Sequence, residues 1–163
     1  MKHVLITGMS GTGKSTVIGQ LVERGHVAID LDGDEFSHWV SVDGDPTGAN
    51  PGHDWMWRED KVAALLAEPL SHDLFVSGTA PNMGVFLPKF DRVILLTTSL
   101  DTMLQRLASR TNNPYGKRPE EVTQVKENLR LVEPRLRQIA DHEIDTDQPL
   151  AQVVDRVVDL VAR

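Results

Sequence analysis

The sequence predicts an α/β protein in which a five-stranded parallel sheet lies between two layers of helices, a three-layer sandwich. Short apolar runs of strand length alternate with longer stretches whose apolar residues recur at helical spacing. This alternation is typical of a parallel sheet covered by helices on both faces. Small polar and acidic residues follow several of the apolar runs, and the carboxyl ends of parallel strands are where such sheets bind ligands.

Composition limits the classes of protein to which the chain can belong. Its 163 residues fit one compact domain with a substantial core. The formal charge of −7 argues against an extended nucleic-acid interface, and the absence of cysteine excludes disulfides and thiolate chemistry. No apolar run reaches the length of a membrane span, and no leader-like segment opens the chain. We therefore expect a cytoplasmic monomer or homodimer without nucleic-acid or membrane partners.

The first part of the chain is expected to hold two strands separated by a helix. Residues 4–7 form the first apolar run, and the helix after the glycine-rich turn ends at Gly25, a residue type suited to the left-handed conformation past a helix end. Residues 26–29 form the second strand. Asp34 and Glu35, in the acidic turn that follows, are expected to cap the next helix.

Residues 42–53 are rich in glycine, proline and asparagine, so this segment is predicted to be a long surface loop. Asp54 then caps a helix that carries Trp55, Trp57 and Arg58. The three tryptophans of the chain flank this loop. They line a pocket for a flat or apolar substrate, or they anchor helices to the core, and the sequence leaves both interpretations open.

Three further apolar runs supply the remaining strands, at residues 73–77, 90–98 and 142–146. The second of these is apolar throughout its centre and is therefore expected to be buried on both faces of the sheet. A helix is predicted from about residue 100, and a long one over residues 119–139 with a kink at Pro134. The valine-rich stripe from about residue 150 predicts a last helix that packs on the sheet.

The turn after the first strand has the spacing Gly-x-x-x-x-Gly-Lys-Ser, which is that of a P-loop. Its glycines allow successive N–H groups to turn inward around a phosphate, and the following helix adds the positive end of its dipole. Lys14 would reach the β and γ phosphates of ATP, and the Ser15 hydroxyl would bind Mg²⁺. The predicted nucleotide-binding residues of this loop are Gly8, Ser10, Gly11, Thr12, Gly13, Lys14, Ser15 and Thr16.

Two aspartates, Asp30 and Asp32, follow the second strand. In an extended backbone their side chains point the same way, and the end of this strand lies beside the expected triphosphate. Carboxylates in this place suit Mg²⁺ or an acceptor hydroxyl. We predict that both aspartates bind the substrate, and that Asp32 also shares the metal with Ser15 and orients or deprotonates the acceptor.

Further acceptor-binding residues are expected in the segment 33–70 and after the third strand. Arg58 is the one cation among the tryptophans, and its guanidinium suits an anionic group. The third strand ends in small polar residues at the same edge of the sheet. Of these, Gly78, Thr79 and Asn82 are predicted to hold the acceptor.

A polar loop with two helix breakers spans about residues 110–118 and has the features of a mobile lid. Arg106 and Arg110 lie four residues apart on one face of the preceding helix, and Lys117 follows in the loop. Both arginines are predicted to bind the nucleotide. Arg110 is also predicted to stabilise the charge that develops on the transferred group.

Together these motifs resemble the small P-loop kinases, the superfamily of shikimate kinase, gluconate kinase, adenylate kinase and other nucleoside monophosphate kinases. The elements that carry the resemblance are the P-loop, Asp30-Leu31-Asp32, Trp57-Arg58, Arg106-Leu107-Ala108-Ser109-Arg110 and the tail 140–146. The resemblance implies a P-loop NTPase fold with strand order 2-3-1-4-5 and a single kinase domain over residues 1–163.

The chain departs from shikimate kinases at two places. They carry a triple glycine after the third strand, where this chain has Ser77-Gly78-Thr79-Ala80. They also carry an acceptor-binding arginine two residues before a proline, where this chain has Val132 before Pro134. Arg130 is the nearest arginine, and the sequence leaves open whether it compensates. Shikimate itself is therefore not the expected acceptor.

The predicted function is transfer of the γ-phosphate of Mg-ATP to a small hydroxylated acceptor. A nucleoside monophosphate is an alternative acceptor, with Arg58 and Arg130 for its phosphate and Trp55 or Trp57 for its base. A regulatory ATPase without an acceptor is a second alternative, although the third strand lacks a terminal acid of the Walker B type. A polynucleotide kinase is disfavoured by the net charge. The aspartate pair favours the hydroxylated acceptor.

Overall fold

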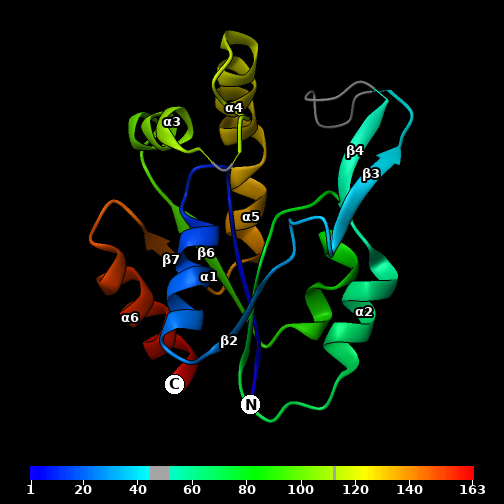
Figure 1. Cartoon of the computed structure of the whole chain (residues 1–163), viewed down its shortest axis with the longest axis vertical. Helices are drawn as coiled ribbons and strands as arrows, with labels where there is room; N and C mark the ends of the chain where they lie inside the picture. The colour runs from blue at the N-terminus through cyan, green and yellow to red at the C-terminus, as the bar shows by residue number, and fades with distance from the viewer. Residues whose placement is uncertain (45–51, 112) are drawn as a thin grey trace.

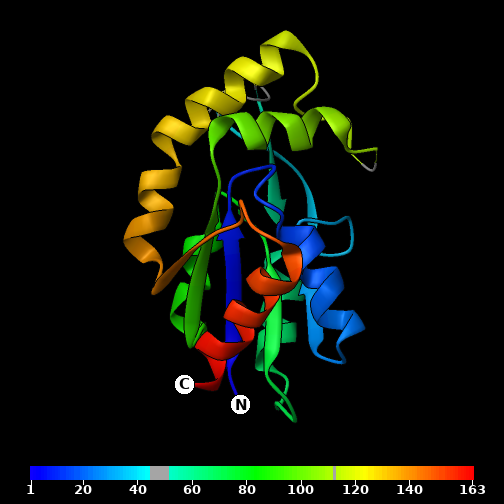
Figure 2. The ribbon, with the colours of Figure 1, turned by 90° about the vertical axis from the view of Figure 1, so that its left-hand side faces the viewer.

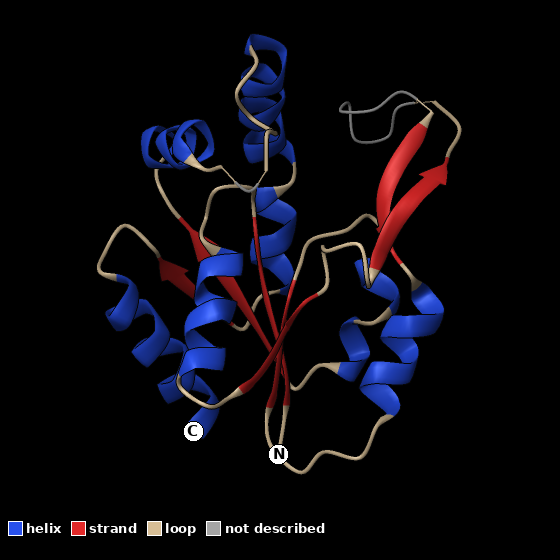
Figure 3. Ribbon diagram, viewed as in Figure 1, coloured by secondary structure: helices blue, strands red, loops and turns tan. Residues whose placement is uncertain are grey.

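The centre of the computed structural model is a twisted sheet of five parallel strands (Figures 1 and 3). The structure describes residues 1–44, 52–111 and 113–163. The strands are β1 (His3–Gly8), β2 (Val27–Asp30), β5 (Leu74–Ser77), β6 (Arg92–Thr97) and β7 (His142–Asp145). Their order is β2-β5-β1-β6-β7, and each neighbouring pair is parallel. The predicted order 2-3-1-4-5 is therefore confirmed.

Strand β1 has the central place in this sheet, between β5 and β6. Val4, Leu5 and Ile6 are fully buried, so both faces of β1 are covered. This is why its sequence is a continuous apolar run rather than an alternating one. The P-loop that follows β1 therefore starts from the central strand of the sheet, with β5 and β6 paired on either side of it.

Helices cover both faces of the sheet and one of its edges (Figure 2). The helices are α1 (Lys14–Glu23), α2 (Glu59–Ala67), α3 (Leu100–Ser109), α4 (Pro119–Leu131), α5 (Glu133–Ile139) and α6 (Leu150–Ala162), and two short 3₁₀ helices are η1 (Met83–Val85) and η2 (Leu87–Lys89). Helices α1 and α6 lie on one face, and α5 lies on the other. Helices α3 and α4 pass above the carboxyl ends of the strands.

Two apolar layers hold the helices to the sheet. On one face, Leu21 of α1 and Val154 of α6 pack in a buried cluster with Ile94 of β6. On the other face, Trp57 and Leu136 belong to a second buried cluster that also includes residues of α2, α3 and α4. Because the two clusters are separated by the sheet, the parallel strands are shielded from water on both sides.

A two-stranded antiparallel sheet corrects the prediction for the segment after β2. The helix expected from Asp54 is wrong over its first residues, because β4 (His53–Trp57) pairs with β3 (Ser37–Ser41) and α2 begins only at Glu59. Tryptophans fit the half-buried face of a strand, and Trp39 lies directly opposite Trp55 in this hairpin. Most of the loop predicted over 42–53 lies outside the described residues.

The acidic turn after β2 also differs from the prediction. Asp34 and Glu35 are exposed and cap no helix, since the chain passes through a turn at Gly33 and Phe36 into β3. The predicted kink near Pro134 is confirmed, because the helix breaks at Val132 and Pro134 lies in the first turn of α5. Proline is tolerated there, where its missing N–H would have no helical partner.

Among the helices that the structure describes, none has the length and apolar character that crossing a bilayer requires.

Burial in α1 predicts unequal effects of two neighbouring substitutions. Leu21 is fully buried and Val22 is 52% exposed. Leu21→Ala should lower the free energy of unfolding by about 2–5 kcal/mol, because it leaves a cavity between α1 and the sheet. Val22→Ala, the matched control in the same helix, should change it by less than about 0.5 kcal/mol. Urea denaturation measures both, and equal losses would contradict the described packing.

Candidate active site

The P-loop joins β1 to α1 through backbone conformations that need glycine. Gly11 has φ +86°, and a Cβ placed on it would lie 2.9 Å from the carbonyl oxygen of Met103. Gly13, the residue before α1, has φ +98°. Side chains are strained in this left-handed region, and at Gly11 there is also no room for one. The loop is therefore packed against α3 at Gly11.

The amides at the start of α1 are available to a ligand. Within residues 1–44, 52–111 and 113–163, the N–H groups of Gly13, Lys14 and Ser15 donate to no protein acceptor. The first N–H groups of a helix lack intrahelical partners and carry the positive end of the helix dipole. This donor set suits a phosphate, as the sequence predicted.

Lys14 holds its ammonium group over the same loop. Its Nζ donates to the carbonyl oxygens of Gly8 at 2.6 Å and Met9 at 3.1 Å. Burial lowers the pKa of Lys14, while the carboxylates of Asp32 and Asp30 raise it and the Arg110 guanidinium lowers it. The lysine therefore lies within electrostatic reach of both aspartates and of the arginine that follows α3.

The end of β2 places Asp30 beside the P-loop serine. The Ser15 hydroxyl donates to Asp30 Oδ2 at 2.9 Å. The other carboxylate oxygen accepts from the amide of Asp32 at 2.9 Å and from the Ser77 hydroxyl at 3.3 Å. A hydroxyl and a carboxylate in contact are the oxygen ligands that Mg²⁺ prefers. Within the described residues, no group of three or more acidic or histidine side chains gathers as around a metal ion.

Asp32 occupies a different environment, enclosed by two tryptophans. Its carboxylate accepts from Trp57 Nε1 at 3.1 Å and from the amide of Thr79 at 3.2 Å, and its backbone carbonyl accepts from Trp55 Nε1 at 2.8 Å. Burial raises the pKa of Asp32, and the Lys14 ammonium and the Trp57 hydrogen bond lower it in part. A carboxylate of this kind is suited to accept a proton from a hydroxyl.

Thr79 connects this aspartate to the P-loop. While its amide binds Asp32, its hydroxyl donates to the carbonyl of Gly8 at 2.8 Å and lies 2.8 Å from the Thr7 hydroxyl. The preceding Gly78 has no room for a side chain, since a Cβ would lie 2.8 Å from Asp32 Oδ1 and 2.9 Å from the Trp57 ring. The strand ends of β1, β2 and β5 are therefore tied together at this point.

Two predicted acceptor residues lie at the junction of β4 and α2, Arg58 within it and Asn82, which precedes η1, in contact with it. Asn82 holds the junction of β4 and α2, because its side chain accepts from the amide of Trp57 at 3.1 Å and donates to its carbonyl at 2.9 Å. Arg58 precedes α2, and its Nε is buried with no hydrogen-bond partner in the described part of the chain. A buried guanidinium nitrogen without a partner is costly unless a ligand completes it.

Arg106 contacts the P-loop directly. Its guanidinium donates to the hydroxyl and to the carbonyl of Thr146, both at 2.8 Å, and to the carbonyl of Gly11 at 3.3 Å. The Thr146 hydroxyl in turn donates to the carbonyl of Thr12 at 2.8 Å. Sequence reasoning placed Thr146 only in a strand and missed this contact. Its signal was the polar end of the last strand, which reaches the same edge of the sheet as β1.

The predicted lid follows α3. Arg110 donates through Nε to the carbonyl of Asn113 at 3.1 Å and through its terminal nitrogen to that of Tyr115 at 2.9 Å. Lys117 Nζ donates to the carbonyl of Arg110 at 2.6 Å. Glu121 of α4 accepts from the amides of Gly116 and Lys117, which joins the end of the loop to the helix that follows. In the described part of this loop, the side chains of Arg110 and Lys117 are thus bound by backbone carbonyls of the loop itself.

The family model described as "AAA domain" matches residues 4–128. The chain belongs to this family. The matched region of this AAA domain includes the P-loop, both aspartates, the hairpin, Arg106 and the loop predicted to be a lid.

Two shikimate kinases are relatives in sequence. That of Thioalkalivibrio sulfidiphilus is 26% identical over 152 residues, which are 90% of this chain and 79% of the relative. That of Caldanaerobacter subterraneus is 24% identical over 164 residues, which are 97% of this chain and 95% of the relative. Similar structures are the shikimate kinase from Acinetobacter baumannii in complex with shikimate and a gluconokinase from Sinorhizobium meliloti.

The shikimate kinase structure has a TM-score of 0.64 at 20% identity and covers 99% of this chain and 93% of its own. The gluconokinase structure has a TM-score of 0.60 at 20% identity and covers 99% and 92%. At this identity the likeness shows a common fold. With the family match, these findings confirm the predicted membership of the small P-loop kinases of the shikimate kinase-like group. The chain is a small-molecule kinase.

The P-loop geometry predicts opposite effects of two glycine substitutions. Gly11→Ala should weaken binding of a fluorescent ADP analogue strongly, because the new Cβ would meet the Met103 carbonyl and the residue has a left-handed backbone. Gly19→Ala is the matched control, since no atom lies within 4 Å of its Cβ position. Within α1 this change should raise the free energy of unfolding by about 0.4–1 kcal/mol and leave binding intact. Equal binding by both variants would contradict the described loop.

The raised pKa of Asp32 predicts a pH-dependent stability difference. Ionised Asp32 is less favoured in the folded than in the unfolded chain, so wild type loses stability as pH rises through the raised pKa. Asp32→Asn should therefore be the more stable protein at neutral pH. The difference should vanish below about pH 3.9, where the carboxyl is protonated in both states. Urea denaturation across this range measures it, with exposed Asp34→Asn as control. A less stable Asp32→Asn at neutral pH would contradict it.

Proposed function

We propose that the kinase transfers the γ-phosphate of Mg-ATP to a hydroxyl group of a small acceptor. The observation that carries this proposal is that a phosphate-binding cation, Lys14, and a buried carboxylate, Asp32, both connect to the carbonyl of Gly8, Lys14 directly and Asp32 through Thr79. One group serves the donor and the other the acceptor, and the Thr79 bridge keeps the two in fixed relation.

The P-loop amides, Lys14 and Arg106 would hold the triphosphate. Mg²⁺, which neutralises the charge of the transferred group when bound, would lie at the Ser15 hydroxyl. The hydrogen bond between Ser15 and Asp30 favours Asp30 as the nearer carboxylate for the metal, and the predicted share of Asp32 in that site stays a prediction. Arg110 and the loop over 110–118 would close over the transferred phosphoryl group and exclude water.

Asp32 would orient the acceptor hydroxyl and take its proton. As the new bond forms between the acceptor oxygen and the γ-phosphorus, the bond to the β-phosphate oxygen breaks and ADP leaves. Gly78 and Thr79 would lie beside the acceptor, because their backbone packs directly against Asp32 and Trp57. Arg58 would bind an anionic group of the acceptor, and its buried Nε supports this assignment. Asn82 would help to hold the acceptor by fixing the backbone of Trp57, which precedes Arg58.

The domain organisation that accompanies this proposal is one kinase domain over residues 1–163. Its segment about 33–70 binds the acceptor, and its segment about 110–118 forms the lid. The similar structure from Acinetobacter baumannii is a complex with shikimate. It supports a small-molecule acceptor for this chain but does not identify that acceptor. We further propose a cytoplasmic monomer or homodimer that binds neither nucleic acid nor membrane.

A coupled ADP-release screen with Mg-ATP tests the function. Its panel holds hydroxylated metabolites and nucleoside monophosphates. A saturable increase in ADP release identifies the acceptor class, and a nucleoside monophosphate as the best acceptor would establish the alternative acceptor. Slow hydrolysis that no acceptor changes would instead support a regulatory ATPase.

Removal of the P-loop ammonium group should abolish turnover and leave the fold intact. We expect Lys14→Ala to lose activity by at least a hundredfold, because Lys14 neutralises charge on the transferred phosphate and an interaction of this kind contributes about 2.7–4 kcal/mol. Lys126→Ala, which removes an exposed lysine of α4 outside both proposed segments, is the control and should keep full activity. Thermal unfolding checks the fold of both proteins. Retained activity in Lys14→Ala would overturn the assignment of the P-loop to catalysis.

A further inference from the structure

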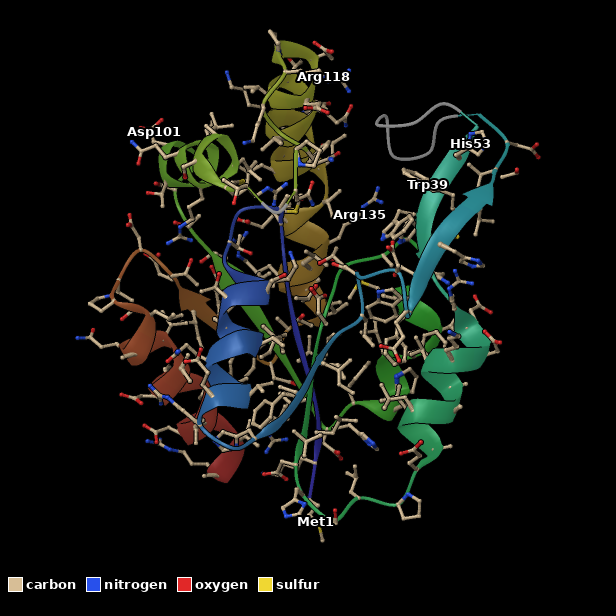
Figure 4. The ribbon with its side chains drawn as sticks, viewed as in Figure 1. Met1, Trp39, His53, Asp101, Arg118 and Arg135 are labelled. Carbon is tan, nitrogen blue, oxygen red and sulfur yellow. The ribbon has the colours of Figure 1, made fainter. Side chains whose placement is uncertain are left out.

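Two indole N–H groups of the hairpin strand β4 donate to one residue, Asp32. Trp55 Nε1 binds its backbone carbonyl oxygen at 2.8 Å, and Trp57 Nε1 binds its Oδ1 at 3.1 Å. The two tryptophans are two residues apart in a strand, so their side chains lie on the same face. Trp39, which Figure 4 shows on the hairpin, lies opposite Trp55 on this face. One face of the hairpin therefore holds both the backbone and the carboxylate of Asp32.

Trp57 is held in place from several sides. Its side chain is 1% exposed, and its ring packs near that of Phe86 with 6.1 Å between centroids. Its amide donates to Asn82 Oδ1 at 3.1 Å, and its carbonyl accepts from Asn82 Nδ2 at 2.9 Å. The backbone of Gly78 lies so close that a Cβ there would be 2.9 Å from the ring. The direction of the Trp57 N–H group is therefore fixed by packing.

The two oxygens of the Asp32 carboxylate are unequally bound. Oδ1 accepts from Trp57 Nε1 and from the amide of Thr79. In the part of the chain that the structure describes, Oδ2 accepts only from that same amide, at 3.2 Å. Each carboxylate oxygen can accept about two hydrogen bonds. Oδ2 therefore keeps room for a further donor.

The plane of this carboxylate depends on the indole. The amide of Thr79 donates to both oxygens at the same distance, so it does not by itself set the plane. The last torsion of an aspartate side chain is broad, and neighbours must restrict it. Trp57 supplies a second donor, which is fixed in space and binds one oxygen only. The direction in which the open lone pairs of Oδ2 point is therefore determined by Trp57.

We propose that Trp57 is a positioning residue: its indole N–H holds Oδ1 of Asp32, so that Oδ2 is directed at the acceptor hydroxyl. This inference rests on the proposed function, since it takes Asp32 as the acceptor base. The proton of the hydroxyl passes to Oδ2 as the acceptor oxygen bonds to the γ-phosphorus and ADP leaves. A base must lie within hydrogen-bond reach of this proton and in the right direction, and Trp57 provides the direction before the acceptor binds.

Indole resonances in the nuclear magnetic resonance spectrum of the full chain test this bond without an acceptor. The chain has three tryptophans, and the signal of Trp57 is identified by its loss in Trp57→Phe. Asp32→Asn should move this signal upfield, because a neutral amide oxygen is a weaker acceptor than a carboxylate. The signal of Trp55 is the internal control and should move less, since its partner is a backbone carbonyl that the substitution keeps. Equal movement of both signals, or none, would overturn the assignment.

Steady-state kinetics test the role of the bond, with the compound of the coupled screen that gives the highest kcat/KM. Trp57→Phe keeps an aromatic ring and removes the N–H group. It should lower kcat about ten- to hundredfold and change KM for the acceptor less than about threefold, because a misdirected base affects the transition state and not the binding of the acceptor.

Phe86→Leu is the matched control for packing. Phe86 is buried beside the Trp57 ring, so this change loosens the same ring but keeps its N–H group. It should lower the free energy of unfolding in urea and keep kcat. An equal loss of kcat in Phe86→Leu and Trp57→Phe would show that Trp57 acts through packing alone, and the proposal would be wrong. If Trp57→Phe does not fold, Trp39→Phe and Trp55→Phe identify the remaining indole signal, and its response to Asp32→Asn decides.

Failure of the proposed function is visible separately. A chain whose Trp57 signal responds to Asp32→Asn, but which releases no ADP with any compound of the panel, keeps the hydrogen bond and loses both the function and the positioning role. A chain that phosphorylates a compound as fast in Trp57→Phe as in wild type keeps the function and loses the inference.

Discussion

The arrangement of the site depends on the Thr79 bridge between the P-loop and Asp32. Its hydroxyl binds the carbonyl of Gly8, where β1 ends, and its amide binds the carboxylate at the end of β2. Parallel strands bring their carboxyl ends to one edge, but they do not by themselves fix the distance between donor and acceptor groups. Thr79 fixes it with hydrogen bonds to both groups from one residue, at 2.8 Å to Gly8 and 3.2 Å to Asp32. The cost of burying Asp32 is then offset where its charge is needed, beside Lys14.

The charges of Lys14, Asp32 and Arg110 influence one another, but these three side chains form no ion pair within the described residues. Burial shifts the pKa of Lys14 downward and that of Asp32 upward, and each charge partly restores the other. Arg110 acts on Lys14 in the same direction as burial. An added polyanion would relieve the repulsion between these two cations, and an added hydroxyl would give Asp32 a proton to accept. The site is therefore stabilised by the ligands that its proposed reaction requires.

Sequence patterns predicted the sheet, its order and the P-loop, because these depend on local apolar runs and on spacing. They failed at the hairpin. The segment 53–57 is too short for its alternation of buried and exposed residues to be distinguished from a helical pattern, and the helical pattern of α2 continues directly after it through Val62 and Leu66. The hydrogen bonds of Ser15 to Asp30 and of Arg106 to Thr146 could not be predicted from the sequence either. Both contacts join residues far apart in the chain, and only the packing of β2 and β7 against the loop determines them.

The two departures from the shikimate kinases, after the third strand and at Val132, have different consequences for the site. Of the stretch Gly78-Thr79-Ala80, only Gly78 lies where a Cβ would strike Asp32 and Trp57. The Thr79 side chain points to the P-loop and Ala80 is buried, so neither replaces a glycine that this site needs. The arginine missing at position 132 is different, because its loss removes a charge that the hydrogen-bond network does not restore. With the P-loop and the aspartates in the roles that we propose, the absence of this cation favours the same reaction on a different acceptor.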